Sequence, residues 1–242
     1  MRVLAVIPAR AGSRRLPGKN TKMLGGHPLV AWSIVAARNS ECFVDVVVSS
    51  DSHDILDISR RYGAMVQGVR PESLATDHAS SADVVIYEVA KYAARRGEID
   101  AVMLLQPTSP FRTTSSIRAA IEIFCGEEQV ESLVSISPSR VKPQWVVRKM
   151  GRRIVPFFEE GLMPADEQDA FELNGAIYLI SWKKLRDSGK FIFPDTNCLV
   201  MTQPFEGIDI DTREDWLVAE AAMRLFKFGG CENSQYSRDR GD

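Results

Sequence analysis

The chain has 242 residues, of which 45% are hydrophobic and 26% charged, the balance of an ordinary soluble globular protein. Its 30 Lys and Arg against 32 Asp and Glu give a formal net charge of −2, so a molecule-wide basic field for nucleic acid is absent and any cationic site must be local. The four cysteines (42, 125, 198, 231) lie far apart from one another and do not group with the three histidines (27, 53, 78), which argues against a disulfide scaffold and a zinc site.

Short apolar runs alternate with helical patterns through the first two-thirds of the chain. The predicted strands cover residues 3–7, 44–48, 101–105 and 132–136. The predicted helices cover residues 28–38, 53–62, 80–96 and 114–124. Strands joined by helical crossovers pair in parallel and are covered on both faces. We therefore expect an α/β fold, a Rossmann-like three-layer sandwich with a mainly parallel sheet.

The pattern changes after Pro138. Residues 139–172 contain three prolines and no clean period, and six basic residues between positions 140 and 153 precede six acidic residues between 159 and 172. A long irregular segment inside a compact domain is usually functional. We expect an inserted arm within a single domain of residues 1–228, with Trp145, Phe157 and Phe158 contacting a partner subunit or closing a sugar pocket.

Regular structure is expected to resume with strands over residues 175–180, 197–201 and 208–210 and a short helix from Ser181. Thr212 opens a last helix, in which Trp216, Ala219, Met223 and Phe226 recur at helical spacing. Trp32 and Trp216 are expected in the core. Residues 229–242 lack an apolar pattern and are expected to form a flexible tail.

A cationic loop directly follows the first predicted strand. Residues 10–22 hold five cationic side chains, two glycines and no acid; these are Arg10, Gly12, Arg14, Arg15, Gly18, Lys19 and Lys22. Ligands of open α/β sheets bind beyond the carboxyl ends of strands, and cations and backbone N–H groups attract phosphate. A polyanionic ligand, most simply a triphosphate, is favoured over a solvated basic loop. The spacing matches neither a P-loop nor a dinucleotide fingerprint.

Asp209 and Asp211 stand two residues apart between isoleucines. In an extended chain both carboxylates point to one face while the isoleucines face the core. Two carboxylates suit Mg²⁺, which commonly takes one or two of them together with substrate phosphates. Alternatively, Asp211 or Thr212 caps the last helix, with Asp215 completing a capping box. Capping leaves Asp209 without a role.

Five segments in this order resemble the cytidylyltransferases that activate nonulosonic (sialic-type) acids, the CMP-sialic acid synthetase family. They are Ile7-Pro-Ala-Arg10-x-Gly12-Ser13-x-x-x-Pro17-x-Lys19-Asn20, Arg70-Pro-Glu-Ser-Leu-Ala-Thr-Asp77 with Ser80-Ser81, Leu105-Gln-Pro-Thr-Ser-Pro-Phe-Arg112, Asn174-Gly-Ala-Ile-Tyr178 and Asp209-Ile-Asp-Thr212. The resemblance covers residues 3–226. Several ordered motifs are far more specific than any one alone.

The resemblance implies a fold of the nucleotide-diphospho-sugar transferase type. It implies transfer of CMP from CTP to the anomeric hydroxyl of an acidic nine-carbon sugar, for surface glycan biosynthesis, with release of pyrophosphate and with Mg²⁺ or Mn²⁺ as cofactor. It also implies a homodimer in which the arm contributes to the neighbour's site. Neither nucleic acid nor a membrane is an expected partner.

Residue roles follow from the same resemblance. The implied catalytic residues are Lys19, Asp211 and Arg10. The implied nucleotide-binding residues are Arg10, Gly12, Ser13, Lys19, Asn20, Arg70, Ala79 and Ser81. The implied sugar-binding residues are Gln106, Thr108, Ser109, Arg112 and Asn174, and the implied metal ligands are Asp209 and Asp211. No His lies in these motifs, so an Asp or a metal-bound hydroxide is the expected base.

Purely structural explanations remain open for some of these residues. Arg70 could simply form an ion pair with Asp77, and residues 106–112 could be only a proline-rich turn before a helix. Two positions depart from the family. Arg14 stands in place of a common Lys, which keeps the charge but changes its geometry. Glu172 near Asn174 stands in place of a common Arg, which leaves the identity of the sugar open. N-acetylneuraminate, a legionaminate-type sugar and Kdo all remain candidates, since residues 15–19 also resemble Kdo cytidylyltransferases.

Other functions also remain at this stage: a nucleotidyltransferase that uses another nucleotide, and an inactive nucleotide-binding homologue. RNA binding rests only on the two basic clusters, and the net charge opposes it. No apolar stretch approaches the roughly 20 residues of a membrane span, and the arginines at 10 and 14 make the N-terminus a poor signal peptide. We therefore expect a cytoplasmic protein.

Overall fold

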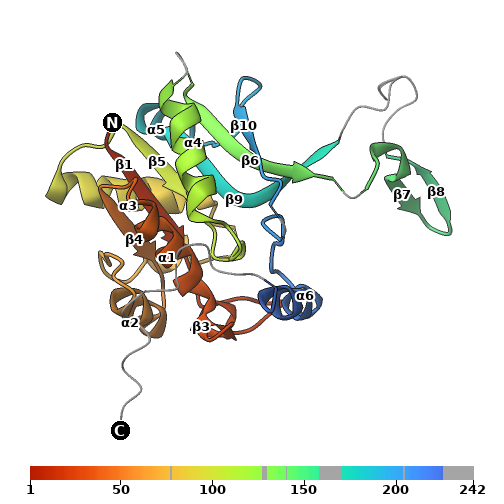
Figure 1. Ribbon diagram of the computed structural model, residues 1–242, viewed down its shortest axis with the longest axis horizontal. Helices are drawn as coiled ribbons and strands as arrows, with labels where there is room; N and C mark the ends of the chain where they lie inside the picture. Colours follow the sequence, from red (N-terminus) through yellow and green to blue (C-terminus); the bar gives the residue numbers. More distant parts are fainter. Residues whose placement is uncertain (77, 127–129, 140, 158–169, 204, 226–242) are drawn as a thin grey trace, which may run out of the picture.

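The computed structural model describes residues 1–76, 78–126, 130–139, 141–157, 170–203 and 205–225. Its central sheet has six strands in the order β10-β6-β9-β5-β1-β4 (Figure 1). They are β1 (Val3–Pro8), β4 (Asp45–Ser49), β5 (Ala101–Leu104), β6 (Ser132–Pro138), β9 (Phe171–Ser181) and β10 (Asn197–Val200). Only β9 runs antiparallel to its neighbours in this sheet. The predicted mainly parallel sheet is confirmed.

Helices cover both faces of this sheet. One layer holds α1 (Leu29–Ser40), α2 (His53–Arg61) and α4 (Thr114–Gly126), and the other holds α3 (Ser81–Arg96) and α5 (Trp182–Ser188). Strand β1 shows why both layers are needed: Val3, Ala5 and Ile7 pack into the first layer, and Leu4 and Val6 into the second. The apolar run at the N-terminus thus predicted a doubly covered strand correctly.

A third apolar cluster holds the last helix, α6 (Arg213–Met223), against the small hairpin of β2 (Met23–Leu24) and β3 (His27–Pro28). Trp216 is buried in this cluster, and Trp32 is also buried, as expected. Thr212 is the N-cap of α6 and forms a capping box with Asp215. The side chain of Asp211 is therefore not the cap of this helix.

The prediction of a strand over residues 208–210 is wrong. Ile208 and Ile210 are buried in the expected alternation, but the segment joins no sheet. The Ile210 N–H instead donates to the carbonyl oxygen of Thr108, in the loop after β5, at 2.8 Å. Alternation predicts an extended segment with one buried face, and it does not tell a strand from a segment that docks on a loop.

The expectation of no regular structure in residues 139–172 is wrong in two places. Strands β7 (Val147–Met150) and β8 (Arg153–Pro156) form an antiparallel hairpin, and β9 begins at Phe171. Gly151 takes a left-handed conformation (φ 62°) in the hairpin turn, where glycine is favoured. The hairpin lies apart from the central sheet, beyond the ends of β6 and β9 (Figure 1).

Several sequence expectations concern residues outside the described ranges. They are the ion pair of Arg70 with Asp77, the contacts of Phe158, the place of Phe226 and the tail over residues 229–242. Across the described residues, no helix combines the length and the apolar character that crossing a membrane requires.

Candidate active site

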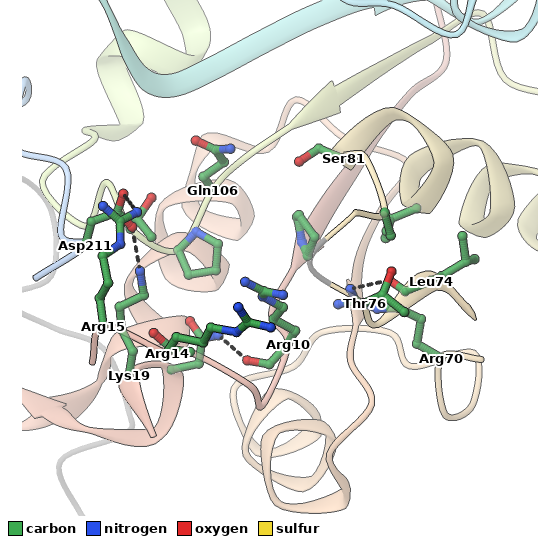
Figure 2. A pocket seen from close by; sticks show the side chains of 17 residues that line it. Arg10, Arg14, Arg15, Lys19, Arg70, Leu74, Thr76, Ser81, Gln106 and Asp211 are labelled. Carbon is green, nitrogen blue, oxygen red and sulfur yellow. Dashed lines mark hydrogen bonds and ion pairs between the residues drawn. The ribbon is translucent and has the colours of Figure 1, made fainter. Parts of the chain in front are cut away.

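A cavity of about 490 Å³ lies beyond the carboxyl ends of β1, β4 and β5. This volume lies in the range of small-molecule sites. Four segments far apart in the sequence line the cavity. Their lining residues are Pro8, Arg10, Ser13, Arg14, Arg15, Lys19, Asn20, Arg70, Leu74, Thr76, Ala79, Ser81, Val84, Gln106, Pro107, Thr108 and Asp211. Figure 2 shows Arg10 and Arg14 between Lys19 and Asp211 on one side and Leu74 and Thr76 on the other.

The loop after β1 supplies the cationic wall. Gly18 takes a left-handed conformation (φ 66°) and starts a 3-10 turn, η1 (Lys19–Thr21), which buries Lys19 and Asn20. The Asn20 Nδ2 donates to the Arg10 carbonyl oxygen at 2.9 Å. The Asn20 Oδ1 is buried and has no hydrogen-bond partner within the described residues. Because buried acceptors are normally hydrogen-bonded, this oxygen at the cavity wall is suited to accept a hydrogen bond from a ligand.

Lys19 connects this loop to the segment that carries the two aspartates. Its Nζ donates to the Ile210 carbonyl oxygen at 2.7 Å and to Asp211 Oδ1 at 3.0 Å. Arg15 Nη2 donates to the other carboxylate oxygen, Oδ2, at 2.6 Å. Asp211 therefore faces the cationic loop with both of its oxygens, across more than 190 residues of sequence.

Asp209 lies beside Asp211 and hydrogen-bonds to the side chain of Thr108. Burial among protein atoms raises the pKa of the Asp209 carboxyl, the charge of Asp211 raises it further, and the Thr108 hydrogen bond opposes the shift. Burial is the main cause of the raised pKa, and repulsion between the Asp209 and Asp211 carboxylates is a smaller contribution. A bound cation would relieve that repulsion.

The opposite wall is built on Arg70. Its guanidinium is buried and holds the end of β4, because Nε donates to Ser49 Oγ at 3.1 Å and Nη2 to the Ser49 carbonyl oxygen at 2.5 Å. Nη1 donates to the Leu74 carbonyl oxygen at 3.3 Å. Arg70 thus fixes the loop that leads to Ala79 and Ser81, at the start of α3.

Gln106 and Thr108 enter the cavity from the loop after β5. A Cβ atom at Gly175 would come within 2.7 Å of Gln106 Oε1, and Gly175 has a φ of +71°. The left-handed backbone favours glycine at this position, and a larger residue would also have to displace the end of the Gln106 side chain. The Asn174-Gly175 step lies within β9 and not in a turn before a strand, and it packs beside the Gln106 side chain.

The model of one protein family matches residues 4–179, and its description is "Cytidylyltransferase". A CMP-N,N'-diacetyllegionaminic acid synthase from Legionella pneumophila is 43% identical over 228 residues, which cover 93% of this chain and 97% of that relative. The chain belongs to the cytidylyltransferase family. It is thus a nucleotidyltransferase by descent, as the ordered motifs predicted.

Two further comparisons place this cytidylyltransferase among its relatives. An N-acylneuraminate cytidylyltransferase from Escherichia coli is 33% identical over 221 residues, 90% of this chain and 51% of that protein. The solved structure of a CMP:2-keto-3-deoxy-manno-octonic acid synthetase complexed with CTP superposes with a TM-score of 0.69 over 93% of this chain and 99% of that chain, at 18% identity. The latter likeness shows the fold alone.

The structure separates the expected site residues of this cytidylyltransferase into two groups. Ten of them line one cavity: Arg10, Ser13, Lys19, Asn20, Arg70, Ala79, Ser81, Gln106, Thr108 and Asp211. Five are not among its lining residues: Gly12, Ser109, Arg112, Asn174 and Asp209. Gly12 is exposed in the same loop, and a Cβ atom there would meet open space, so neither backbone nor packing requires glycine.

Three of the expected sugar-binding residues hydrogen-bond within the protein instead of facing the cavity. The Ser109 Oγ donates to the Asn174 carbonyl oxygen at 3.2 Å. The Asn174 carboxamide accepts from Ser135 Oγ and donates to Ser137 Oγ. The buried Arg112 donates to the Ala176 and Gln106 carbonyl oxygens at 2.6 and 2.8 Å. These residues hold the walls of the cavity in place.

Seven residues that line the cavity were absent from the expected set: Pro8, Arg14, Arg15, Leu74, Thr76, Val84 and Pro107. Among these seven, Arg14 and Arg15 are the charged ones. The signal was present, because both belong to the cationic loop. Glu172, the departure that left the sugar open, lies exposed on β9 and is not among the described residues that line the cavity.

Proposed function

We propose that the protein transfers CMP from CTP to the anomeric hydroxyl of a nonulosonic acid and releases pyrophosphate, as a single domain of residues 1–228. The observation that carries the proposal is the meeting of the cationic loop and Asp211 at one cavity. Binding of a triphosphate needs cations that neutralise its negative charge. Attack on a phosphorus atom needs further neutralisation of the charge that develops on the phosphates. The family membership supports the same reaction class.

Each wall of the cavity has a separate task in this proposal. Arg10, Arg14 and Lys19 neutralise the triphosphate, so that a hydroxyl can approach the α-phosphorus. The Asn20 Oδ1 accepts a hydrogen bond from a ligand donor such as a ribose hydroxyl. The wall around Arg70 and Ser81 takes the cytidine.

The carboxylates of Asp209 and Asp211 are suitable ligands for a divalent cation. Asp209 and Asp211 present hard carboxylate oxygens two residues apart. Burial is the main cause that raises the pKa of Asp209, and the charge of Asp211 adds to it. We infer that these two residues would hold Mg²⁺ or Mn²⁺. When bound, the cation supplies charge neutralisation at the phosphates. Asp211 also remains our candidate for the proton-accepting group.

The acidic sugar is proposed from the relatives. The higher identity to the legionaminic acid synthase than to the neuraminate enzyme makes a legionaminate-type acid the first substrate to test. N-acetylneuraminate is the second. Likeness to the octonic acid synthetase shows only the fold, so an eight-carbon acid is the third.

The first prediction is selective pyrophosphate release. Purified protein with CTP and Mg²⁺ is expected to release pyrophosphate with a nine-carbon nonulosonic acid and about tenfold more slowly with the eight-carbon Kdo. A polar group of the site that loses its partner costs about 1–3 kcal/mol, and about 1.4 kcal/mol corresponds to a tenfold change in rate. Replacing CTP by ATP, GTP or UTP serves as the control. Release with none of the acidic sugars, or faster release with a purine nucleotide, would contradict the proposal.

We also propose a homodimer built on the β7–β8 hairpin. Both faces of this hairpin are exposed, and an isolated two-stranded hairpin is marginally stable in water. Ile154 is 70% exposed and Trp145 is 67% exposed. Apolar side chains on a projecting hairpin are typical of a surface that a partner covers. A second copy of the chain is the proposed partner, with this arm reaching the neighbouring site.

The second prediction tests this dimer. Ile154→Asp is expected to convert a dimer to a monomer in sedimentation velocity at micromolar protein, because the charge would be buried without a counter-ion. Leu217→Asp is the matched control, since Leu217 is equally large and 58% exposed but lies on α6. A monomeric wild type, or an Ile154→Asp protein that stays dimeric, would refute the proposed dimer.

A further inference from the structure

Glu206 is a buried carboxylate, 1% exposed, and it is not among the described residues that line the cavity. Its Oε1 accepts hydrogen bonds from the Thr113 N–H at 3.3 Å, from Thr113 Oγ1 at 3.0 Å and from Ser116 Oγ. These donors form the start of α4. A carboxylate is favourable at a helix N-terminus because free N–H groups and the helix dipole are positive there. Glu206 is thus held by the first turn of α4.

The neighbouring Arg112 is held by several hydrogen bonds. Arg112 precedes α4, is 2% exposed and feels the negative charge of Glu206. Its guanidinium donates to the Ala176 carbonyl oxygen of β9, to the Gln106 carbonyl oxygen and to Ser33 Oγ of α1. Arg112 thus joins a strand, a helix and the loop that forms the cavity wall, and the negative charge of Glu206 favours its charged form.

The residues between Glu206 and Asp211 are held by close packing and by a backbone hydrogen bond. A Cβ atom at Gly207 would lie 3.0 Å from Ser137 Oγ, so this step packs closely against β6. Ile208 and Ile210 are buried, and the Ile210 N–H donates to the Thr108 carbonyl oxygen. Asp209 and Asp211 are therefore displayed from a segment that is fastened at Glu206 and again at Ile210.

We propose that Glu206 is a positioning residue that sets the place of Asp209 and Asp211 relative to the cavity. This inference rests on the proposed function, in which the two aspartates hold the cation. Groups that orient metal-binding side chains typically change metal affinity or activity ten- to a hundredfold when they are removed. A misplacement of about 1 Å at a reacting site has a similar effect. Glu206 reaches the reaction only through the segment that it fastens.

The test is Glu206→Ala in the full-length chain. We expect kcat to fall about tenfold or more and the Mg²⁺ concentration for half-maximal activity to rise about tenfold. KM for CTP should change less than about twofold, because Arg70 and Ser81 lie on the other wall. Independently of activity, amide hydrogen exchange over residues 205–212 should become faster.

Glu206→Gln keeps an acceptor oxygen for Thr113 and Ser116, and we expect it to recover most of the lost turnover. Ser116→Ala removes one donor to Glu206 and keeps the carboxylate, so it provides a test if Glu206→Ala does not fold. We expect this variant to need a two- to fivefold higher Mg²⁺ concentration. Asp45→Asn is the matched control, since Asp45 accepts a hydrogen bond from Tyr92 at the opposite end of the sheet. It should leave the Mg²⁺ requirement unchanged.

Two results would overturn the inference. One is an unchanged Mg²⁺ requirement in both Glu206→Ala and Ser116→Ala; the other is Glu206→Gln being as impaired as Glu206→Ala. A wild type that releases no pyrophosphate with any acidic sugar would instead refute the proposed function. In that case the hydrogen-exchange comparison still tests whether Glu206 fastens residues 205–212.

Discussion

Lys19→Met is expected to lower turnover with CTP and the accepted sugar by about 10²- to 10³-fold, the loss typical for removing a charge-stabilising donor from an active site. Lys19 is 8% exposed, and its ammonium group reaches both Ile210 and Asp211. Methionine keeps the apolar stem and removes only the charge and the donors. The measurement is kcat and KM from continuous pyrophosphate detection.

Lys22→Met is the matched control for Lys19→Met. Lys22 belongs to the same cationic loop, but its ammonium group lies over the ring of Trp216, 4.3 Å from the centroid, and it does not line the cavity in the described structure. Its variant should keep turnover within about threefold, since an exposed cation–π contact contributes little. Comparable losses in both variants would show that the loop matters only through its total charge.

Asp211→Ala is expected to abolish turnover, with at least a 10³-fold loss, and to leave the fold intact. The loss follows because Asp211 is both a proposed cation ligand and the partner of Arg15 and Lys19. The fold should survive because the Asp211 side chain is 37% exposed and its pair with the exposed Arg15 contributes only about 0–1 kcal/mol. The buried Lys19 keeps its hydrogen bond to the Ile210 carbonyl oxygen. Thermal unfolding should therefore shift by no more than about 4 °C.

Asp195→Ala serves as the control, because Asp195 also pairs with a lysine, Lys184, but at the surface away from the cavity. It should have full activity. Near-normal turnover of Asp211→Ala would place the cation elsewhere. A collapse of its thermal stability would instead show that Asp211 is needed for folding, which its exposure and the capping of α6 by Thr212 argue against.

Local patterns in the sequence predicted most of the layered architecture. The apolar run at β1 fills both layers of the core because a strand between two helix layers has no polar face. The capping box of Thr212 and Asp215 marked the start of α6 to the residue. The cationic loop after β1 pointed to the cavity because its charges are adjacent in the chain and follow a strand end.

Long-range pairing could not be predicted in the same way. The sequence pattern of β9 does not show that it runs antiparallel between β5 and β6, since direction depends on the connection and not on the residues. The β7–β8 hairpin was missed because its apolar side chains face outward and match no core period. Arg112 and Asn174 look like ligand contacts in a motif, yet both are buried.

The amino-acid sequence by itself thus predicted the alternation of strands and helices, the family motifs and the chemistry of each candidate group. Only the folded structure decided that Arg15 and Lys19 meet Asp211, that Glu206 is fastened to α4, and that Arg112 supports the wall of the cavity instead of lining it. The physical reason is that strand alternation, helical periodicity and helix capping are patterns of a few neighbouring residues, whereas these hydrogen bonds join segments 64 to 196 residues apart. Tertiary packing alone sets such distances.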